Sequence, residues 1–244
     1  MVSFTAEQRF IVTGASSGIG ASVALTLNEL GATVIAVARR QEVMLEKRME
    51  SVAPDRFLIE PCDLVGDLDS LADFVKDIRK KHGKLSGMAY CAGIVPIIPL
   101  RSLDAGSMKR AFDINLFAPV IMMRAGAAKR NNVGNGTSCV FISSAASIIS
   151  DKGHGVYSAT KAALNAAMRS FAKELAPIGI RVNCILPTNI QTEKTTQEYM
   201  ASQIAQYPMG FGRPRDVANL ASFLLSSESK WITGQNYILD CASF

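Results

Sequence analysis

Short apolar runs rich in β-branched residues recur along the chain, separated by longer segments with helical periodicity. Within the runs, apolar residues follow one another without alternating with polar residues, which is typical of strands buried on both faces of a sheet. The sequence therefore predicts strands at 10–13, 33–38, 85–90, 138–143, 180–185 and 236–240. A further strand is expected just before "PCD" at 61–63.

The intervening segments carry apolar residues at helical spacing. The pattern predicts helices at 19–30, at 67–80, at 105–130 with a break at Pro119, at 157–176, and after residue 213. Strands that alternate with helices indicate βαβ units and a parallel sheet covered by helices on both faces. The expected fold class is therefore α/β, without internal repeats or low-complexity linkers.

One segment, 187–212, shows no clean period and mixes Pro, Gly, Thr and polar residues. We expect a single domain spanning 1–244 in which this segment is either a substrate lid or a small helical flap. Its apolar residues recur at intervals and favour a mostly apolar pocket. They are Met200, Tyr207, Met209 and Phe211.

Composition and charge exclude several classes of function. The net charge of +5 is mild and its Lys and Arg residues are scattered, so no nucleic-acid partner is expected. No run of 18 apolar residues occurs, which predicts no membrane span. Five widely spaced cysteines without a CxxC pair favour neither a metal site nor a disulfide framework. Together with the lack of a secretory signal, they favour a cytoplasmic location.

The first strand runs into "GASSGIG" and then into a helix, so Gly14, Gly18 and Gly20 lie in the connecting turn. Glycines there allow a sharp turn, a close approach of backbone N–H groups to a pyrophosphate, and tight packing of helix on sheet. The helix N-terminus adds partial positive charge for phosphates. This strand-to-helix context predicts a dinucleotide site.

The second strand ends in Ala38, Arg39 and Arg40, where a carboxylate would bind the ribose 2′-hydroxyl of NAD. Two guanidinium groups instead favour the 2′-phosphate of NADP(H) over NAD(H). The alternative is that both arginines are solvated surface charges. Asp63, after the third strand, could accept a hydrogen bond from adenine or cap a helix.

The predicted fifth strand ends at Ser143 and Ser144, and Tyr157 and Lys161 follow four residues apart on one predicted helix. An ammonium beside a phenol favours the phenolate and would lower its pKa. A serine hydroxyl can bind a carbonyl oxygen, so the trio suits acid–base chemistry on a ketone/alcohol pair beside a hydride carrier. Taken alone, a Tyr and a Lys at this spacing are more often a surface pair. His154, three residues before Tyr157, could contact a substrate or lie exposed in a loop.

These motifs together resemble the classical short-chain dehydrogenase/reductases over nearly the whole chain. The resemblance implies a Rossmann-like, doubly wound, mostly parallel seven-stranded sheet and a homotetramer or dimer. The matching stretches are "TGASSGIG" at 13–20, "NLF" at 115–117, "YSATK" at 157–161, "GRPRDVA" at 212–218 and "ITGQNYILD" at 232–240.

The resemblance also implies residue roles. Tyr157 is expected to act as acid/base, Lys161 to lower its pKa and hold the nicotinamide ribose, and Ser144 to polarise the carbonyl. Asn115 is expected to interrupt its helix and hold a water in a proton relay. The expected cofactor-binding residues are Gly14, Ser16, Ser17, Gly18, Ile19, Gly20, Arg39, Arg40, Asp63, Leu64, Cys91, Ala92, Gly93, Tyr157, Lys161, Pro187, Ile190 and Thr192.

Five positions depart from the family pattern: Tyr90 and Cys91 stand where the family has two asparagines, Thr188 where it has glycine, and Cys241 and Ala242 where it has two glycines. The asparagines usually brace neighbouring strands, so the local bracing is in question. The final pair bears on subunit contacts. An inert buried thiol is favoured for Cys91 because no basic partner is adjacent.

The sequence thus predicts an NADP(H)-dependent oxidoreductase that interconverts a ketone and a secondary alcohol. Its small-molecule substrate could be a 3-oxoacyl thioester, or a small polyol, sugar or other carbonyl compound. An alternative of another class is a dinucleotide-sensing protein without catalysis, against which the intact set of four catalytic-type residues argues.

Overall fold

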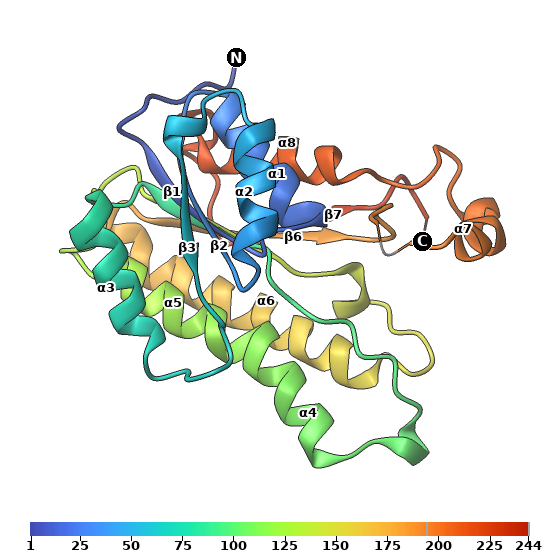
Figure 1. Cartoon of the computed structure of the whole chain (residues 1–244). Coiled ribbons are helices and arrows are strands. Elements are labelled where there is room, and N and C mark those ends of the chain that lie inside the picture. Colours follow the sequence, from blue (N-terminus) through green and yellow to red (C-terminus); the bar gives the residue numbers. More distant parts are fainter. Residues whose placement is uncertain (194, 244) are drawn as a thin grey trace.

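Seven parallel strands form one sheet in the computed structural model, which describes residues 1–193 and 195–243 (Figure 1). The strand order is β3-β2-β1-β4-β5-β6-β7, and every neighbouring pair is parallel. The Rossmann-like, doubly wound fold is therefore confirmed, with a sheet that is wholly parallel. The strands are β1 (Arg9–Thr13), β2 (Thr33–Ala38), β3 (Phe57–Pro61), β4 (Gly87–Tyr90), β5 (Ser138–Ile142), β6 (Arg181–Pro187) and β7 (Asn236–Leu239).

Helices cover both faces of this sheet (Figure 1). One face carries α1 (Gly18–Glu29), α2 (Gln41–Glu50) and α8 (Pro214–Leu225). The other carries α3 (Leu71–His82), α4 (Ala105–Phe112), α5 (Ala118–Ala127) and α6 (Gly155–Leu175). The short helix α7 (Gln197–Gln203) lies apart from both layers, beyond the ends of β6 and β7 (Figure 1).

Two apolar cores lie on the two faces because side chains alternate along each strand. Ile11 of β1 packs into the core under α3, α5 and α6, whereas its neighbours Phe10 and Val12 pack into the core under α1 and α8. Strands β1, β2, β5 and β6 are buried almost throughout. This double burial explains why their sequences read as continuous apolar runs.

The elements that the apolar pattern missed or left vague lie at the edge of the sheet. Strand β3 is an edge strand with a single buried residue, Phe57, so it carries only a short apolar run. Helix α2 packs through one buried side chain, Met44, which leaves no apolar stripe to read. Exposed edge elements need little apolar surface, and the periodicity signal fades with it.

The predicted break at Pro119 is wrong. The chain continues from α4 through a π-helix, η3 (Asp113–Phe117), into α5, and Pro119 occupies the first turn of α5. The ring of Pro119 fixes φ near the helical value, so the helix passes through this position and loses one backbone donor there. The irregularity instead lies one turn upstream, where the widened turn confirms the expectation that the helix is interrupted at Asn115.

Tyr90 bridges the sheet to this π-helix. Because Pro119 has no N–H, it cannot donate to the carbonyl oxygens of the preceding turn. The hydroxyl of Tyr90, at the end of β4, donates to the carbonyl oxygen of Ile114 at 2.9 Å. The Tyr90 ring is 1% exposed and stacks on Phe141 of β5 at 6.2 Å between centroids. Tyr90 therefore provides a brace at the position where the family pattern has an asparagine.

Replacing Tyr90 by Phe should destabilise the fold by about 1–2 kcal/mol, because the Ile114 carbonyl loses its buried donor. For a chain of this size the melting temperature should fall by roughly 2–8 °C. Tyr237→Phe, on β7, is the matched control, because its half-buried hydroxyl bonds no described residue. Differential scanning calorimetry of both variants measures the melting temperatures. Equal melting temperatures for the Tyr90 and Tyr237 variants would show that the Tyr90 hydroxyl does not stabilise the fold.

Candidate active site

The predicted site residues gather along one edge of the sheet. Since all strands are parallel, their carboxyl ends share this edge, where ligand crevices form in open α/β sheets. The glycine loop follows β1, Arg39 and Arg40 follow β2, and Asp63 and Leu64 follow β3. Pro187 ends β6, and Asn115 lies in the π-helix η3. The other predicted residues follow β4, β5 and β6 or lie in the first turns of α6, and they are Cys91, Ala92, Gly93, Ser144, Tyr157, Lys161, Ile190 and Thr192.

The glycine loop forms a backbone cradle against the end of β4. Gly14 has φ +68°, and a Cβ there would lie 3.1 Å from the amide nitrogen of Ala92. A Cβ on Gly20 would overlap the carbonyl oxygen of Gly14. Thr13 holds the facing loop by accepting from the amides of Cys91 and Ala92 at 3.0 and 3.1 Å. The cradle has the shape that a dinucleotide pyrophosphate requires, with the N-terminus of α1 behind it.

The basic pair after β2 lies at one side of this cradle. Arg40 donates from Nη2 to the hydroxyl of Ser16 at 3.3 Å, so the guanidinium is held against the glycine loop. Arg39 is exposed. Asp63 accepts from the amide of Val65 at 3.3 Å within a turn, and the cap residue of α3 is Ser70. The helix-capping alternative for Asp63 is therefore wrong, and its carboxylate stays available at the sheet edge.

Ser144, Tyr157 and Lys161 converge where β5 meets α6. Lys161 is 5% exposed and donates from Nζ to the carbonyl oxygen of Ile142 at 2.8 Å. Its Nζ lies 5.9 Å from the centroid of the Tyr157 ring. Ser144 accepts from the amide of Ala146 at 3.1 Å, and its side chain lines the same cavity as that of Tyr157. The spatial grouping that the sequence predicted is thus present.

Burial controls the protonation of this group. Burial raises the pKa of Tyr157 despite the opposing hydrogen bond from Ser144. Burial also lowers the pKa of Lys161 to about 8. The expectation of a lowered phenol pKa is therefore wrong for the protein by itself. A Tyr157 that keeps its proton at neutral pH is suited to donate it.

Asn115 links the π-helix to the loop after β4. Its Oδ1 accepts from the amide of Ile94 at 3.1 Å, and its Nδ2 donates to the Ile94 carbonyl oxygen and to Thr160 Oγ1 at 3.0 and 3.1 Å. A Cβ on Gly93 would lie 3.0 Å from Asn115 Oδ1 and 3.6 Å from Lys161 Nζ. The missing side chain of Gly93 therefore leaves a small space between Asn115 and Lys161.

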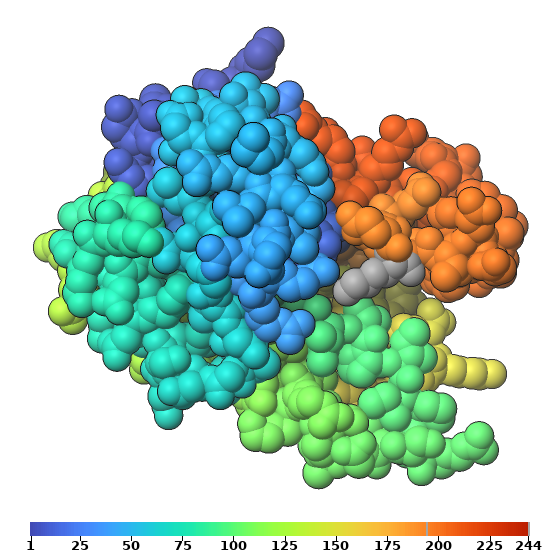
Figure 2. Space-filling view, in the orientation of Figure 1, coloured from blue at the N-terminus to red at the C-terminus, as the bar shows by residue number. Residues whose placement is uncertain are grey.

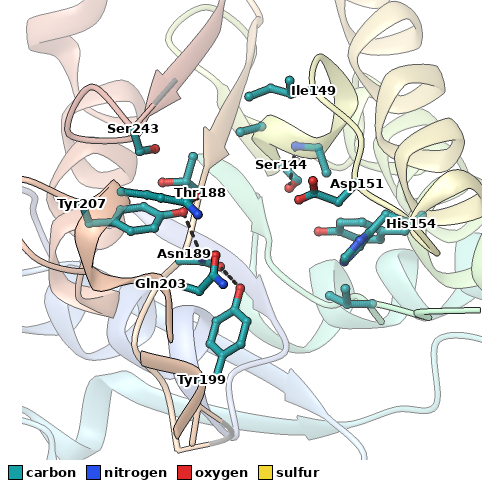
Figure 3. Close-up of a pocket in the computed structure, with 15 residues that line it drawn as sticks. Ser144, Ile149, Asp151, His154, Thr188, Asn189, Tyr199, Gln203, Tyr207 and Ser243 are labelled. Atoms are coloured by element: carbon teal, nitrogen blue, oxygen red, sulfur yellow. Dashed lines mark hydrogen bonds between the residues drawn. The ribbon is translucent and has the colours of Figure 1, made fainter. Parts of the chain in front are cut away.

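A cavity of about 330 Å³ opens beside Ser144 and Tyr157 (Figure 3). One wall comes from the loop after β5, with Asp151 and His154, and the other from segment 188–207 (Figure 3). In the space-filling view, residues near 200 and residues near 100 and 150 form the two sides of a hollow (Figure 2). Ser144 and Tyr157 thus line the same cavity.

The expected mostly apolar pocket is wrong for this cavity. Apart from Tyr207, the apolar residues of the lid face a separate hollow of about 430 Å³. They include Met200, Met209 and Phe211. The cavity beside Tyr157 is instead lined largely by hydroxyl, amide and charged side chains. Whether residues 187–212 move as a lid stays a prediction.

A hydrogen-bonded trio on the lid wall was missed by the sequence reading. Asn189 accepts from the Tyr199 hydroxyl at 3.0 Å through Oδ1 and donates from Nδ2 to the Tyr207 hydroxyl at 2.8 Å (Figure 3). The residues are 10 and 18 positions apart, with α7 between Asn189 and Tyr207. The one sequence signal for this trio was the predicted strand before Asn189, which places Asn189 at the carboxyl edge of the sheet.

The cysteines of this chain form no disulfide. All five cysteines are unpaired, and burial raises the pKa of Cys91 to about 12. This supports the inert-thiol interpretation. Across residues 1–193 and 195–243, no cluster of three or more His, Cys, Asp or Glu residues could hold a metal ion. Within the same residues, no helix has the length and hydropathy needed to cross a bilayer.

Comparison with protein families gives one match over most of the chain. The family model described as enoyl-(acyl carrier protein) reductase matches residues 14–241. A 3-oxoacyl-acyl-carrier-protein reductase of Rickettsia felis is 32% identical over 232 residues, or 92% of each chain. L-Xylulose reductase of Caenorhabditis elegans is 32% identical over 242 residues, covering 96% of this chain and 94% of that protein.

Solved structures with the same architecture include two of similar length. A short-chain type dehydrogenase/reductase from Mycobacterium ulcerans has a TM-score of 0.90 and 31% identity, covering 99% of this chain and 90% of that one. A short chain dehydrogenase from Burkholderia cenocepacia, solved in complex with NADP, has a TM-score of 0.86 and 25% identity, covering 97% and 98%.

Replacing Lys161 by Met should change how stability depends on pH. The Lys161 pKa is lowered from 10.5 to about 8, so between these values the unfolded chain binds a proton that the folded chain does not. The stability of the native protein should therefore rise with pH between about pH 8 and 10.5. Below pH 8 the folded protein carries the full cost of burying a charged Lys161 ammonium. Near pH 7 the variant should be more stable than the native protein, by on the order of 2 kcal/mol.

The measurement is denaturant unfolding of both proteins, without cofactor, from pH 6 to 10. Lys173→Met serves as the control, because it removes an exposed ammonium from the same helix. The difference between native protein and Lys161→Met should shrink as the pH rises above 8. A difference that does not vary with pH would show that Lys161 titrates at its ordinary value.

Proposed function

The chain belongs to the short-chain dehydrogenase/reductase family of oxidoreductases, and from this premise we propose that it interconverts a ketone and a secondary alcohol with NADP(H). The observation that carries the proposal is that Ser144 and Tyr157 line one cavity at the carboxyl edge of the sheet, with the buried Lys161 ammonium 5.9 Å from the centroid of the Tyr157 ring. The glycine cradle lies on the same edge, which supports a cofactor site beside the acid–base group.

In this mechanism, Ser144 and Tyr157 bind the substrate oxygen from their positions at the cavity. Tyr157 donates its proton to that oxygen in the direction of reduction and accepts it in the direction of oxidation. The nicotinamide, when bound, supplies or accepts the hydride. Lys161 is anchored on Ile142, and its Nζ lies over the Tyr157 ring. Because its pKa is about 8, Lys161 is mostly a charged ammonium at neutral pH. The positive charge stabilises the phenolate that proton donation creates.

Asn115 and Gly93 provide the path by which Tyr157 and Lys161 regain a proton. The side-chain-free position at Gly93 leaves space between Asn115 Oδ1 and Lys161 Nζ. Asn115 is held in place by Ile94 and Thr160, so its amide cannot turn away. A water in this space would accept a hydrogen bond from Lys161 Nζ and donate one to Asn115 Oδ1.

The preference for NADP(H) over NAD(H) is supported by the arginine pair. Arg40 is held against the glycine loop through Ser16, and Ala38 closes β2 where an acid would select NAD. Guanidinium groups bind a phosphate through charge-assisted, often bidentate hydrogen bonds. The Burkholderia cenocepacia structure was solved with NADP, which accords with this assignment.

The predicted roles of the remaining cofactor residues belong to the same proposal. Backbone and side chains of the glycine loop would hold the pyrophosphate, and Asp63 and Leu64 would border the adenine. Pro187, Ile190 and Thr192 would border the nicotinamide end, and a Cβ on Gly18 would lie 3.4 Å from Thr192 Cγ2. Thr192 therefore approaches the glycine loop, which places the base of the lid at the cofactor side of the site.

Replacing Tyr157 by Phe should lower ketone reduction by at least about a thousandfold, because the proton donor is lost while the ring and its packing remain. NADPH binding should change by less than about threefold. The rate of ketone reduction is measured spectrophotometrically as NADPH oxidation, and the affinity for NADPH is measured by fluorescence titration. A variant that still reduces ketones at the native rate would overturn the proposal, whereas a native protein that binds NADPH but reduces no ketone would favour the sensor alternative.

Replacing Arg40 by Ala should lower kcat/KM for NADPH by roughly 10- to 100-fold, the value of one or two charge-assisted hydrogen bonds. The value for NADH should change by less than about threefold, because NADH carries no 2′-phosphate. Arg215→Ala is the charge-matched control, since Arg215 pairs with Glu29 at the far end of α1. Equal losses with both cofactors would contradict the assignment of Arg40 to the 2′-phosphate.

A further inference from the structure

The cavity beside Tyr157 is small and carries little charge. Its volume of about 330 Å³ is near the lower end for ligand sites, roughly 300–1,000 Å³. Among the described residues that line it, Asp151 is the one with a full charge, and no Lys or Arg is present. A phosphate or carboxylate of a substrate would meet a carboxylate of the same sign and no counter-ion among these described lining residues. The lining therefore favours an uncharged substrate.

The lid wall presents a fixed donor and a fixed acceptor. Asn189 donates to the Tyr207 hydroxyl oxygen, so the Tyr207 proton is directed elsewhere and can be donated. The Tyr199 hydroxyl donates its hydrogen bond to Asn189 Oδ1, so its lone pairs remain free to accept a hydrogen bond from a substrate. A hydroxyl group on a substrate offers one donor and two acceptor lone pairs, which complements such a pair. Gln203, Gln206 and Ser243 add further polar groups on this side (Figure 3).

His154 presents a donor from the opposite wall. Its position is fixed, because its amide donates to the Asp151 carbonyl oxygen at 3.1 Å and its own carbonyl oxygen accepts from Ser158 at 2.8 Å. Its Nδ1 is buried and bonds no described residue. A buried N–H without an acceptor costs more than a bare nitrogen, so the proton belongs on Nε2. The ring borders the cavity beside Tyr157, so Nε2–H is available to an oxygen of the substrate (Figure 3).

We propose that this cavity selects an uncharged polyhydroxylated ketone, or the corresponding polyol, and that His154, Tyr199 and Tyr207 recognise hydroxyl groups next to the reacting carbon. Asn189 acts as a positioning residue that orients the two tyrosines. The inference rests on the proposed ketone/alcohol activity and narrows it to one of the two substrate classes. An acyl chain would bury these polar groups without partners, at about 1–3 kcal/mol for each.

The first test compares five-carbon ketones with and without hydroxyl groups, and adds an acyl thioester. L-Xylulose and D-ribulose are assayed with NADPH against pentan-2-one and against the N-acetylcysteamine thioester of acetoacetate, which is an uncharged thioester. At least one pentulose should exceed pentan-2-one in kcat/KM by about 100-fold or more, because a site built to bind hydroxyls rejects an analogue that lacks them. Equal or better turnover of pentan-2-one or the thioester would overturn the inference while leaving the proposed function intact.

The second test measures the selectivity ratio, which is kcat/KM for the better pentulose divided by that for pentan-2-one. His154→Phe retains an aromatic ring but loses the donor, and should lower the ratio by about tenfold or more. His154→Gln restores an N–H donor and should recover part of the ratio. Asn189→Leu should raise KM for the pentulose more than it lowers kcat, because it releases the two tyrosines without touching the reacting group.

Met200→Leu is the matched control, because Met200 lines the separate apolar hollow and should leave the ratio unchanged. Calorimetry of each variant checks that it folds. If His154→Phe does not fold, His154→Gln is used in its place. An unchanged ratio in every His154 and Asn189 variant that folds would overturn the assigned roles. Absence of turnover with every ketone would overturn the proposed function and the inference together.

Discussion

The site depends on the hydrogen bond between Lys161 and the carbonyl oxygen of Ile142. This 2.8 Å contact joins α6 to the end of β5, and a buried ammonium has few other ways to satisfy its charge. It fixes the axial position of α6, and with it the place of Tyr157 relative to Ser144. The same burial that anchors Lys161 lowers its pKa to about 8 and raises that of Tyr157. Position and protonation of the acid–base group therefore have one physical cause.

Tyr90, which replaces an asparagine of the family pattern, is accommodated by a hydrogen bond to the π-helix. The widened turn places Asn115 against Ile94 and Thr160, and Pro119 follows it without an N–H. Tyr90 reaches across from β4 to bind the Ile114 carbonyl. A large side chain from the sheet thus performs the bracing that a shorter amide performs in the family pattern. The interrupted helix and its brace together hold Asn115 and the space beside Gly93 at the site.

The lid segment separates two kinds of surface. Its Met and Phe side chains gather in one hollow, while Asn189, Tyr199 and Tyr207 turn toward the cavity with Ser144 and Tyr157. On the short helix α7, the neighbours Tyr199 and Met200 line different hollows, because successive residues of a helix face in different directions. Three polar side chains of this segment therefore line the cavity, although sequence hydropathy would rank them below their apolar neighbours.

The sequence by itself determined the alternation of strands and helices, the glycine turn, and the grouping of Ser144, Tyr157 and Lys161, because burial on both faces and fixed motif spacing are local signals. Edge elements such as β3 and α2 bury too little to leave such a signal. The tertiary structure alone decided the direction of the Tyr157 pKa, the polarity of the cavity and the Asn189 trio. Each of these depends on desolvation or on contacts between residues far apart in the chain, which no local pattern encodes.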